Sequence, residues 1–353
     1  MASLDEPGFM NAMVMRGFGA PEVMQLERVP IPVPGPQDIL VRVHSVSVNR
    51  TLDLRVRAGD YPRAPALPHV LGVDPAGRVA AVGAEVTDLK VGDPVAISSR
   101  ILVPGSPRPK MLGMDVWGGY AEYVCVPARN GHLLPDGMDF AAASIALRHM
   151  PQAFHMLETK ARLQKGEWVL IMGAAGGLGS ASVQLARHLG GRVIVAAGAD
   201  SRVVAAMTVG GEFGINYRTQ DLYAEVMRIT ANQGVNVVCE NIGDPELFSA
   251  AFKSLGRFGR LVTVGSHGGG TVPLDISHLY INQITIMGST MIAPDDVQKS
   301  LALATSGGFE PLIDRVMPLQ DAAQAHAIAA SGDLVGKIVL DPQMAVSGAA
   351  GGR

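Results

Sequence analysis

The chain has 353 residues, of which 48% are hydrophobic and 17% are charged, and this length and composition are typical of two globular domains. The formal net charge is −3 and no basic run is interleaved with aromatic residues, so we expect no nucleic-acid partner. No apolar run has the length of a membrane-spanning helix, and the only two cysteines, Cys125 and Cys239, lie far apart. We therefore expect no membrane partner, no disulfide and a cytoplasmic protein.

The first 150 residues predict a β-rich domain of short strands separated by turns rich in proline and glycine. The expected strands cover residues 12–16, 39–48, 76–82, 94–97 and 120–126.

Residues 164–290 instead alternate strands with helices. The expected strands cover residues 168–172, 192–197, 213–216, 235–240, 260–264 and 285–288, and the helices 178–189, 201–209, 222–230, 245–255 and 276–282. Fully apolar strands that alternate with helices predict a parallel sheet covered by helices on both faces.

After residue 294 a helix, a strand, a helix and a strand are expected at 297–305, 314–318, 322–330 and 337–340. We expect this last segment to return to the first domain. The predicted domains are therefore 1–150, completed by 295–353, and 151–294.

A turn of small residues joins the first strand of the second domain to its first helix. Residues 173–179 read GAAGGLG, which resembles the dinucleotide pattern Gly-x-Gly-x-x-Gly with Ala174 at its first position. Such a turn lets a pyrophosphate approach the main chain at a helix N-terminus, although it also serves as a tight connection without a ligand. The residues expected to bind the cofactor here are Ala174, Gly176, Gly177, Leu178 and Gly179.

The end of the second strand distinguishes the two nicotinamide dinucleotides. A carboxylate at this position holds the ribose 2′-hydroxyl of NAD, whereas this chain has Ala197. Ser201 and Arg202 follow, and both donate hydrogen bonds of the kind that suits a 2′-phosphate. We therefore predict NADPH (NADP) as the cofactor, while Asp200 lies close enough to be an alternative carboxylate.

Eight segments occur in an order that resembles the medium-chain dehydrogenase/reductase superfamily, and within it the zinc-free, quinone oxidoreductase-like branch. They are residues 67–77, 91–95, 118–123, 174–179, 215–217, 259–265, 287–290 and 336–340. The resemblance implies an α/β fold class: a GroES-like β-rich catalytic domain plus a Rossmann domain with a doubly wound parallel sheet, and the active site between the two. It also implies a homodimer formed through the last Rossmann strand. The further cofactor contacts that it implies are Tyr217, Asn241, Gly243, Gly265, Ser266, Gly288 and Ser289.

The sequence predicts no metal. Zinc-dependent members of this superfamily have Gly-His-Glu where this chain has Gly-Val-Asp at 72–74, and a cysteine in the region of residues 48–53, where this chain has none. Residues 98–117 contain no cysteine for a structural zinc either. His149 and His155 are six residues apart, a spacing that does not place them on one helix face, and zinc needs about four ligands.

The candidate catalytic residues are Asn49, Arg55, Tyr61 and His149. Many zinc-free relatives carry a tyrosine where this chain has Arg55, so Tyr61 is the alternative proton donor. Arg55 is suited to polarise a carbonyl or to bind an anion, Asn49 to orient the substrate and His149 to donate a proton. Arg55, Asn49 and His149 are also typical of ordinary surface, turn or hydrogen-bonded positions.

We therefore expect a zinc-independent NADPH-dependent oxidoreductase that transfers hydride to a small molecule: a quinone, an enone or other activated alkene, or a reactive carbonyl. Two alternatives remain open. One is an NADP-linked alcohol dehydrogenase that uses a residue such as His149 in place of zinc. The other is a cofactor-binding relative without enzymatic activity.

Overall fold

A computed structural model describes residues 8–106, 108–266, 268–290, 294–332 and 334–344 of the chain. The chain divides into two compact units: unit 1 comprises Met1–Arg148 with Ile313–Arg353, and unit 2 comprises His149–Leu312. The two ends of the predicted first domain, residues 1–7 and 345–353, lie outside the described residues. The chain leaves unit 1 within helix α2 (Phe140–Phe154) and re-enters it at strand β17 (Ile313–Pro318).

Unit 1 is built mainly from antiparallel strands. Its largest sheet has the order β10-β6-β5-β3-β18-β17, with β9 also paired to β3, while β2-β1-β4 and β7-β8 form two smaller sheets. The remaining strands are β1 (Phe9–Met15), β2 (Met24–Pro30), β3 (Asp38–Ser47), β4 (His69–Val70), β5 (Ala76–Val82), β6 (Pro94–Ile97), β7 (Arg100–Ile101), β8 (Lys110–Met111), β9 (Tyr123–Pro127), β10 (Gly131–Leu133) and β18 (Lys337–Asp341). The helices are η1 (Pro21–Val23), α1 (Asp53–Ala58), η2 (Ala128–Asn130), η4 (Leu319–Asp321) and α9 (Ala322–Ser331).

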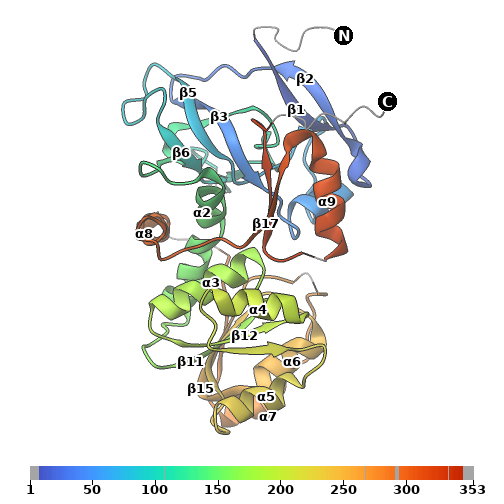
Figure 1. Cartoon of the computed structure of the whole chain (residues 1–353), viewed down its shortest axis with the longest axis vertical. Coiled ribbons are helices and arrows are strands. Elements are labelled where there is room, and N and C mark those ends of the chain that lie inside the picture. The colour runs from blue at the N-terminus through green and yellow to red at the C-terminus, as the bar shows by residue number, and fades with distance from the viewer. Residues whose placement is uncertain (1–7, 107, 267, 291–293, 333, 345–353) are drawn as a thin grey trace, which may run out of the picture. The chain divides into compact units, whose positions relative to one another are not determined.

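Strand β3 organises unit 1 because three other strands pair with it. It is antiparallel to β5, β9 and β18, and its pairing with β18 places Val46 opposite Leu340. Most of its residues are buried in the hydrophobic core of the unit. The pairing of β18 with β3 explains why the C-terminal segment returns, as the red α9 and β17 beside the blue strands in Figure 1 illustrate.

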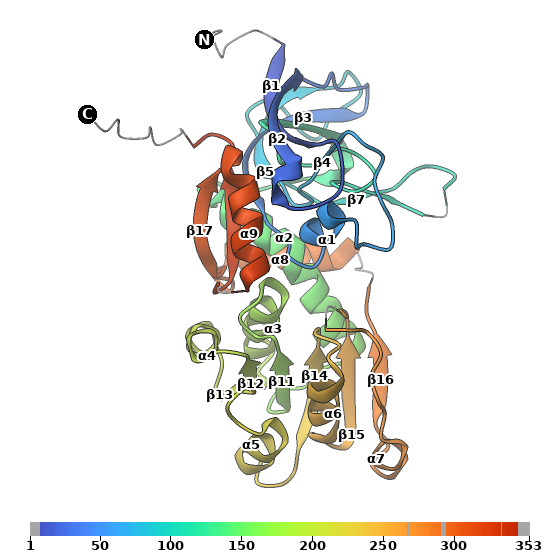
Figure 2. The same ribbon diagram turned by 90° about the vertical axis from the view of Figure 1, so that its right-hand side faces the viewer.

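Unit 2 contains a six-stranded parallel sheet with the order β13-β12-β11-β14-β15-β16, which Figure 2 shows from one side. The strands are β11 (Trp168–Met172), β12 (Arg192–Ala197), β13 (Phe213–Asn216), β14 (Val235–Glu240), β15 (Leu255–Thr263) and β16 (Thr285–Gly288). The helices are α3 (Gly177–His188), α4 (Asp200–Thr208), α5 (Leu222–Ile229), α6 (Pro245–Lys253), α7 (Ile276–Ile281) and α8 (Pro294–Thr305), and a π-helix, η3 (His155–Lys160), continues α2.

The central strands of this sheet are buried on both faces. Residues 169–172 of β11 and 193–197 of β12 are all buried, as expected from their continuous apolar sequence. All six expected strands are present, although β15 begins at Leu255, earlier than expected. The order of the strands reverses direction at the β11–β14 pair, so the carboxyl ends of these two strands form the point at which open α/β sheets bind ligands.

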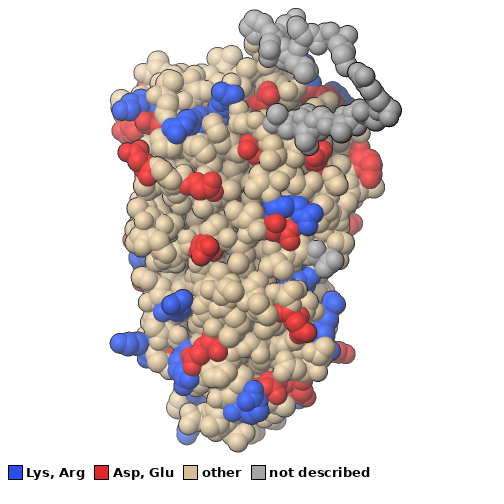
Figure 3. Space-filling model, viewed as in Figure 1, with Lys and Arg blue, Asp and Glu red and all other residues tan. Residues whose placement is uncertain are grey.

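The charged residues of the described surface do not gather by sign on the face drawn in Figure 3. Lys and Arg alternate there with Asp and Glu over both units, in keeping with the net charge of −3. None of the helices in the described part of the chain has the length and apolar character needed to cross a membrane.

Candidate functional site

The turn between β11 and α3 is held together by its glycines. Gly173 has a φ of +62°, and a Cβ at Gly179 would collide with the carbonyl oxygen of Gly173. Helix α3 therefore packs directly on the turn. Gly176 is the N-cap residue with an extended backbone, so the helix begins at Gly177 and its first N–H groups have no acceptor within the helix. This arrangement fits the pyrophosphate of a dinucleotide.

The ends of β14 and β15 lie close to this turn and to each other. A Cβ at Gly173 would stand 2.9 Å from Asn241 Oδ1, and a Cβ at Gly243 would stand 2.8 Å from the Cα of Ser266. A Cβ at Gly265 would collide with the Asn241 carbonyl oxygen. The structure thus brings four of the predicted cofactor residues to one edge of the sheet, where only small side chains and backbone are accommodated.

Glu240 fixes the loops at this edge and was not singled out from the sequence. Its buried carboxylate accepts hydrogen bonds from the backbone N–H groups of Ile242 (2.7 Å) and Gly243 (2.8 Å), and from the Thr263 hydroxyl (3.1 Å). These bonds connect the end of β14 to the end of β15. A carboxylate as the last residue of a mostly apolar strand was the available sequence signal.

The end of β12 presents the residues predicted to choose between NADPH and NADH. Ala197 is buried, and α4 begins three residues later with Ser201 and Arg202 in its first turn. A Cβ at Gly198 would lie 3.0 Å from Tyr217 Oη, so the tyrosine covers this strand end. The Asp200 carboxylate accepts a hydrogen bond from Asn216 Nδ2 at 2.6 Å, which directs it toward β13.

His149, Gly288 and Ser289 also lie in unit 2. A Cβ at Gly177 would collide with the His149 ring, so this histidine lies against the first turn of α3. Ser289 follows Gly288 at the end of β16, is 2% exposed, and donates its backbone N–H to Thr263 O at 2.9 Å.

Asn49 belongs to a buried polar cluster in unit 1, which we define as Ser47, Asn49, Asp53, Asp74 and Lys337. The Lys337 ammonium donates to Asn49 Oδ1 at 2.8 Å and to Val48 O at 2.6 Å. Asn49 Nδ2 donates to Asp74 Oδ2 at 3.1 Å, and Asp74 also accepts from the Ser47 N–H and hydroxyl. The amide of Asn49 is therefore engaged at both ends within the protein.

The charges of the polar cluster perturb one another. Burial raises the pKa of Asp53 to about 6, and the charge of Asp74 adds to this effect. Burial lowers the pKa of Lys337 to about 8, against the opposing influence of Asp74 and Asp53. One oxygen of Asp53 accepts from the Asn49 N–H at 2.8 Å and from Tyr120 Oη at 3.3 Å. Lys337 was not predicted as a site residue; in the sequence it is part of the segment 336–340, which resembles the superfamily.

Arg55 and Tyr61 lie together in unit 1, within α1 and just after it. The Arg55 guanidinium carbon is 5.9 Å from the centre of the Tyr61 ring, and Arg55 Nη2 donates to Asp60 O at 2.9 Å. Both side chains are half-buried. The structure thus places the candidate cation, Arg55, beside the candidate proton donor, Tyr61.

A protein zinc site is built from about four Cys, His or carboxylate ligands. Within the described residues, no three or more His, Cys, Asp or Glu side chains gather closely enough to hold a metal. In the polar cluster, the charges of Lys337 and Arg148 act on Asp53, and two cations beside a carboxylate disfavour the binding of a third.

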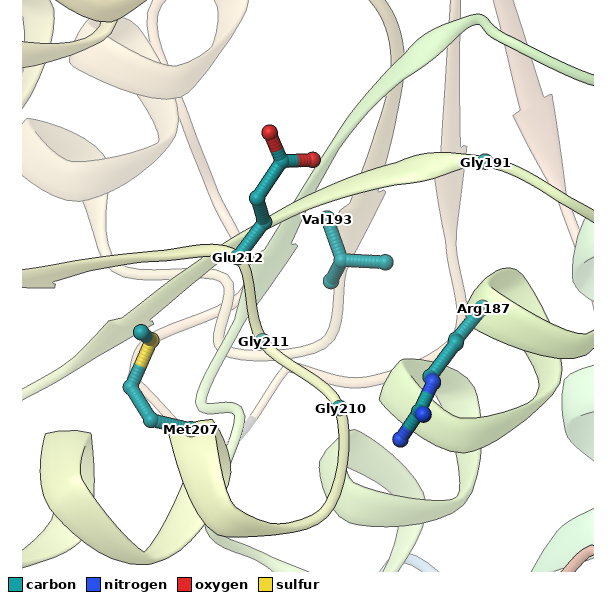
Figure 4. Close-up of a pocket in the computed structure, with 7 residues that line it drawn as sticks. All are labelled: Arg187, Gly191, Val193, Met207, Gly210, Gly211 and Glu212. Atoms are coloured by element: carbon teal, nitrogen blue, oxygen red, sulfur yellow. The ribbon is translucent and has the colours of Figure 1, made fainter.

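Two surface hollows lie at the opposite edge of the unit 2 sheet. One, of about 340 Å³, lies beside the start of β12 (Figure 4), and its lining residues are Arg187, Gly191, Val193, Met207, Gly210, Gly211 and Glu212. The other, of about 570 Å³, is lined by residues that include Glu167, Arg260 and Thr285, near the starts of β11 and β16. Neither is lined by residues of the β11–α3 turn or by Asn241, Gly243, Gly265 or Ser266, so neither is the predicted dinucleotide site.

Both units are similar to known protein families. A family described as "Alcohol dehydrogenase GroES-like domain" matches residues 35–136, and one described as "Zinc-binding dehydrogenase" matches residues 177–306. The quinone oxidoreductase of Sus scrofa is 32% identical over 342 residues, which cover 94% of this chain and 97% of that protein. The NAD-dependent alcohol dehydrogenase of Sulfolobus acidocaldarius is 31% identical over 350 residues, which cover 94% and 99%. The crystal structure of AibC matches with a TM-score of 0.88 at 30% identity, over 96% of this chain and 97% of that one.

Proposed function

Because the chain belongs to the quinone oxidoreductase-like branch of the medium-chain dehydrogenase/reductase superfamily and is an NAD(P)H-dependent oxidoreductase, we propose that it is a zinc-independent enzyme that uses NADPH. Its substrate in this proposal is a quinone, an enone or other activated alkene, or a reactive carbonyl. The observation that carries the proposal is the glycine-packed turn between β11 and α3, at the strand ends where the sheet order reverses. The bound nicotinamide supplies the hydride.

Three features at the end of β12 support NADPH over NADH. Ala197 offers no carboxylate to repel a 2′-phosphate, Arg202 in the first turn of α4 supplies a guanidinium, and the nearby Asp200 bonds to Asn216. A guanidinium binds phosphate oxygens through two parallel hydrogen bonds.

The polar cluster supports zinc independence. A protein that uses zinc needs Cys, His or carboxylate ligands that can turn to the metal, whereas here Asp74 accepts three hydrogen bonds from Ser47 and Asn49. Lys337 adds a positive charge to the same cluster when it is protonated, although burial lowers its pKa to about 8.

In this proposal the residues of unit 1 orient the substrate and supply the proton. Tyr61 is the proton donor, and the adjacent Arg55 supplies the cation that polarises a carbonyl or holds an anionic substituent. Asn49 acts indirectly, because Lys337 and Asp74 already occupy its amide. His149 belongs by its position to the dinucleotide site, beside Gly177.

An NADP-linked alcohol dehydrogenase is the second candidate. The similarity to an NAD-dependent alcohol dehydrogenase of Sulfolobus acidocaldarius at 31% identity favours it. The two candidates differ in the reaction that they support: the alcohol dehydrogenase reduces NADP with an alcohol and leaves activated alkenes intact.

Thermal unfolding of chelator-treated protein with NADPH, NADH or zinc added separately tests the proposal, because a ligand that binds the native state raises the midpoint. We expect the largest rise with NADPH, followed by NADPH oxidation in a panel of quinones, enones and carbonyls. A rise with zinc, or with NADH alone, would favour the alcohol dehydrogenase. Absence of any response to NADPH would overturn the proposal.

The choice of cofactor is tested by Arg202→Ala. We expect the affinity for NADPH to fall about tenfold or more, because a charge-assisted contact to the 2′-phosphate is lost, while the affinity for NADH stays the same. Arg187→Ala, an exposed arginine at the other end of the neighbouring helix α3, is the matched control. Equal losses for both cofactors in Arg202→Ala would contradict the assignment.

A homodimer and a cytoplasmic location complete the proposal. The edge strand β16 and the preceding helix α7 expose the apolar side chains of Ile286, Ile276, Tyr280 and Ile281, which a second copy would cover. Cys125 and Cys239 are both free thiols, as is usual in a reducing compartment.

A further inference from the structure

Three polar side chains, spaced three residues apart on α2 and η3, contact the carboxyl-terminal edge of the unit 2 sheet. They are His149, Gln152 and His155, and we refer to them as the polar edge. Residues three apart on a helix lie on neighbouring turns, and six residues advance a helix by about 9 Å. The polar edge therefore extends across several strand ends of the sheet, from α3 to the end of β16.

His149 forms one end of the polar edge. Its ring stands where a Cβ of Gly177 would be, so only glycine at the first position of α3 leaves room for it. An imidazole carries an N–H donor, and the first turn of a helix carries free backbone donors. The imidazole therefore lies beside the N-terminus of α3, next to the place where the pyrophosphate of the proposed cofactor would sit.

Gln152 and His155 form the other end, and both contact Ser289. Gln152 Nε2 donates to Ser289 Oγ at 2.7 Å, while His155 Nδ1 lies 3.4 Å from the same oxygen. The short bond fixes the position of the hydroxyl oxygen as an acceptor. At 3.4 Å the bond between Ser289 Oγ and His155 Nδ1 is long, so it orients the hydroxyl while a closer acceptor on a ligand would take over the hydroxyl hydrogen.

We propose that the polar edge positions the two halves of the dinucleotide separately: His149 donates to the pyrophosphate, and Gln152 with His155 orients Ser289 so that its hydroxyl donates to the nicotinamide carboxamide. This inference rests on the proposed function, since it assigns residues to the cofactor of that function. It gives His149 a binding role in place of the proton-donor role considered from the sequence. It also makes Gln152 a positioning residue, which acts through Ser289.

Cofactor fragments separate the two halves in a binding experiment. NADPH contains the nicotinamide, the pyrophosphate and the adenosine 2′-phosphate; 2′-phospho-ADP-ribose lacks the nicotinamide; adenosine 2′-monophosphate lacks both the nicotinamide and the pyrophosphate. Their dissociation constants are measured by calorimetry for the full chain and for His149→Phe and Gln152→Met, two variants that keep the approximate shape of each side chain but remove its donor.

For His149→Phe we expect NADPH and 2′-phospho-ADP-ribose to bind about tenfold more weakly, with adenosine 2′-monophosphate unchanged. For Gln152→Met we expect about a fivefold loss for NADPH alone. His149→Gln, which retains a donor, should recover part of the affinity. Gln184→Met is the control, because Gln184 is a buried glutamine of the same unit that bonds to Glu310 instead.

The outcomes separate this inference from the function on which it rests. If the unaltered chain binds none of the three compounds, both fail. If it binds NADPH but His149→Phe leaves the pyrophosphate-containing compounds unaffected, or Gln152→Met weakens all three equally, the polar edge has only a packing role and the proposed function stands. Circular dichroism and the thermal midpoint verify that each variant is folded.

Discussion

Asp53 and Lys337 carry opposite charges inside unit 1, and burial moves their pKa values toward neutrality. The pKa of Asp53 rises from 3.8 to about 6, and that of Lys337 falls from 10.5 to about 8. A carboxyl whose pKa is raised in the folded state binds more protons there than in the unfolded state. Its stabilising contribution is therefore complete below about pH 3.8 and is lost as the pH rises through 6. Lys337 has the opposite effect: because its pKa is lowered in the folded state, the free energy of unfolding rises between pH 8 and 10.5.

The variant Asp53→Asn tests this charge effect. One oxygen of Asp53 accepts both hydrogen bonds, and the other has no partner among the described residues, so an amide fits with its oxygen toward Asn49 and Tyr120. We expect the free energy of unfolding of the unaltered chain to fall by about 2–3 kcal/mol between pH 4 and 7 relative to that of the variant. Urea unfolding over this range measures the difference.

The control for this measurement is Asp60→Asn, because Asp60 is an exposed carboxylate just after the same helix α1. It should leave the pH dependence of unfolding unchanged. Parallel curves for the unaltered chain and Asp53→Asn would show that the buried carboxylate does not titrate in this range.

Among the elements, the β11–α3 connection separates two roles of glycine. Gly179 lies against the Gly173 carbonyl, where a methyl group would collide, whereas a Cβ at Gly176 would stand 3.4 Å from the same oxygen, an ordinary contact. We expect Gly179→Ala to lower the free energy of unfolding by about 1–3 kcal/mol and to weaken NADPH binding. Gly176→Ala should keep its stability but also bind NADPH more weakly, because the added methyl group faces the approaching pyrophosphate.

Chemical denaturation and NADPH titration of the two glycine variants distinguish these roles. Equal stability of Gly179→Ala and the unaltered chain would mean that the helix shifts to accommodate the methyl group. Unchanged NADPH affinity in Gly176→Ala would mean that the cofactor does not approach the N-cap of α3.

The elements of unit 2 were predictable because each carries a local signal. Its strands β11 and β12 are apolar runs buried on both faces, and α5, α6 and α7 begin after aspartates that cap them, Asp221, Asp244 and Asp275. The extent of α2 and η3 was not predictable, because Pro151 lies inside the helix and a π-helix has no sequence rule of its own. The contacts of the polar edge were missed for the same reason.

The polar cluster could not be predicted from local sequence either. Its members come from β3 and the loop after it, from α1, from the loop before β5 and from β18, which follows them by more than two hundred residues. Only the pairing of β18 with β3 brings Lys337 to Asn49. The motifs identified the superfamily and the fold class, and both are confirmed, but they contain no information on which buried side chains meet.

At the scale of the whole molecule, the six-stranded sheet of unit 2 and the largest sheet of unit 1 each end in an exposed edge strand, β16 and β17. In the described part of the chain, β16 pairs only with β15, and β17 only with β18. Beside β16 lies helix α7, with the exposed apolar residues Ile276, Tyr280 and Ile281. An edge strand next to exposed apolar surface is a template for pairing with another chain. A twofold axis through β16 would join the sheets of two copies and cover this surface.

Ile286→Lys tests the dimer at β16, since Ile286 is 37% exposed in the middle of that strand. A lysine there would meet its symmetry mate or apolar surface across the axis, and we expect the dimer to dissociate to monomers in sedimentation velocity at micromolar concentration. Val316→Lys is the matched control, because Val316 is 43% exposed on the edge strand β17 of the other sheet. Dissociation by both variants would reflect general destabilisation, and dissociation by Val316→Lys alone would place the interface on unit 1. A dimer that persists in Ile286→Lys would show that β16 is not the interface.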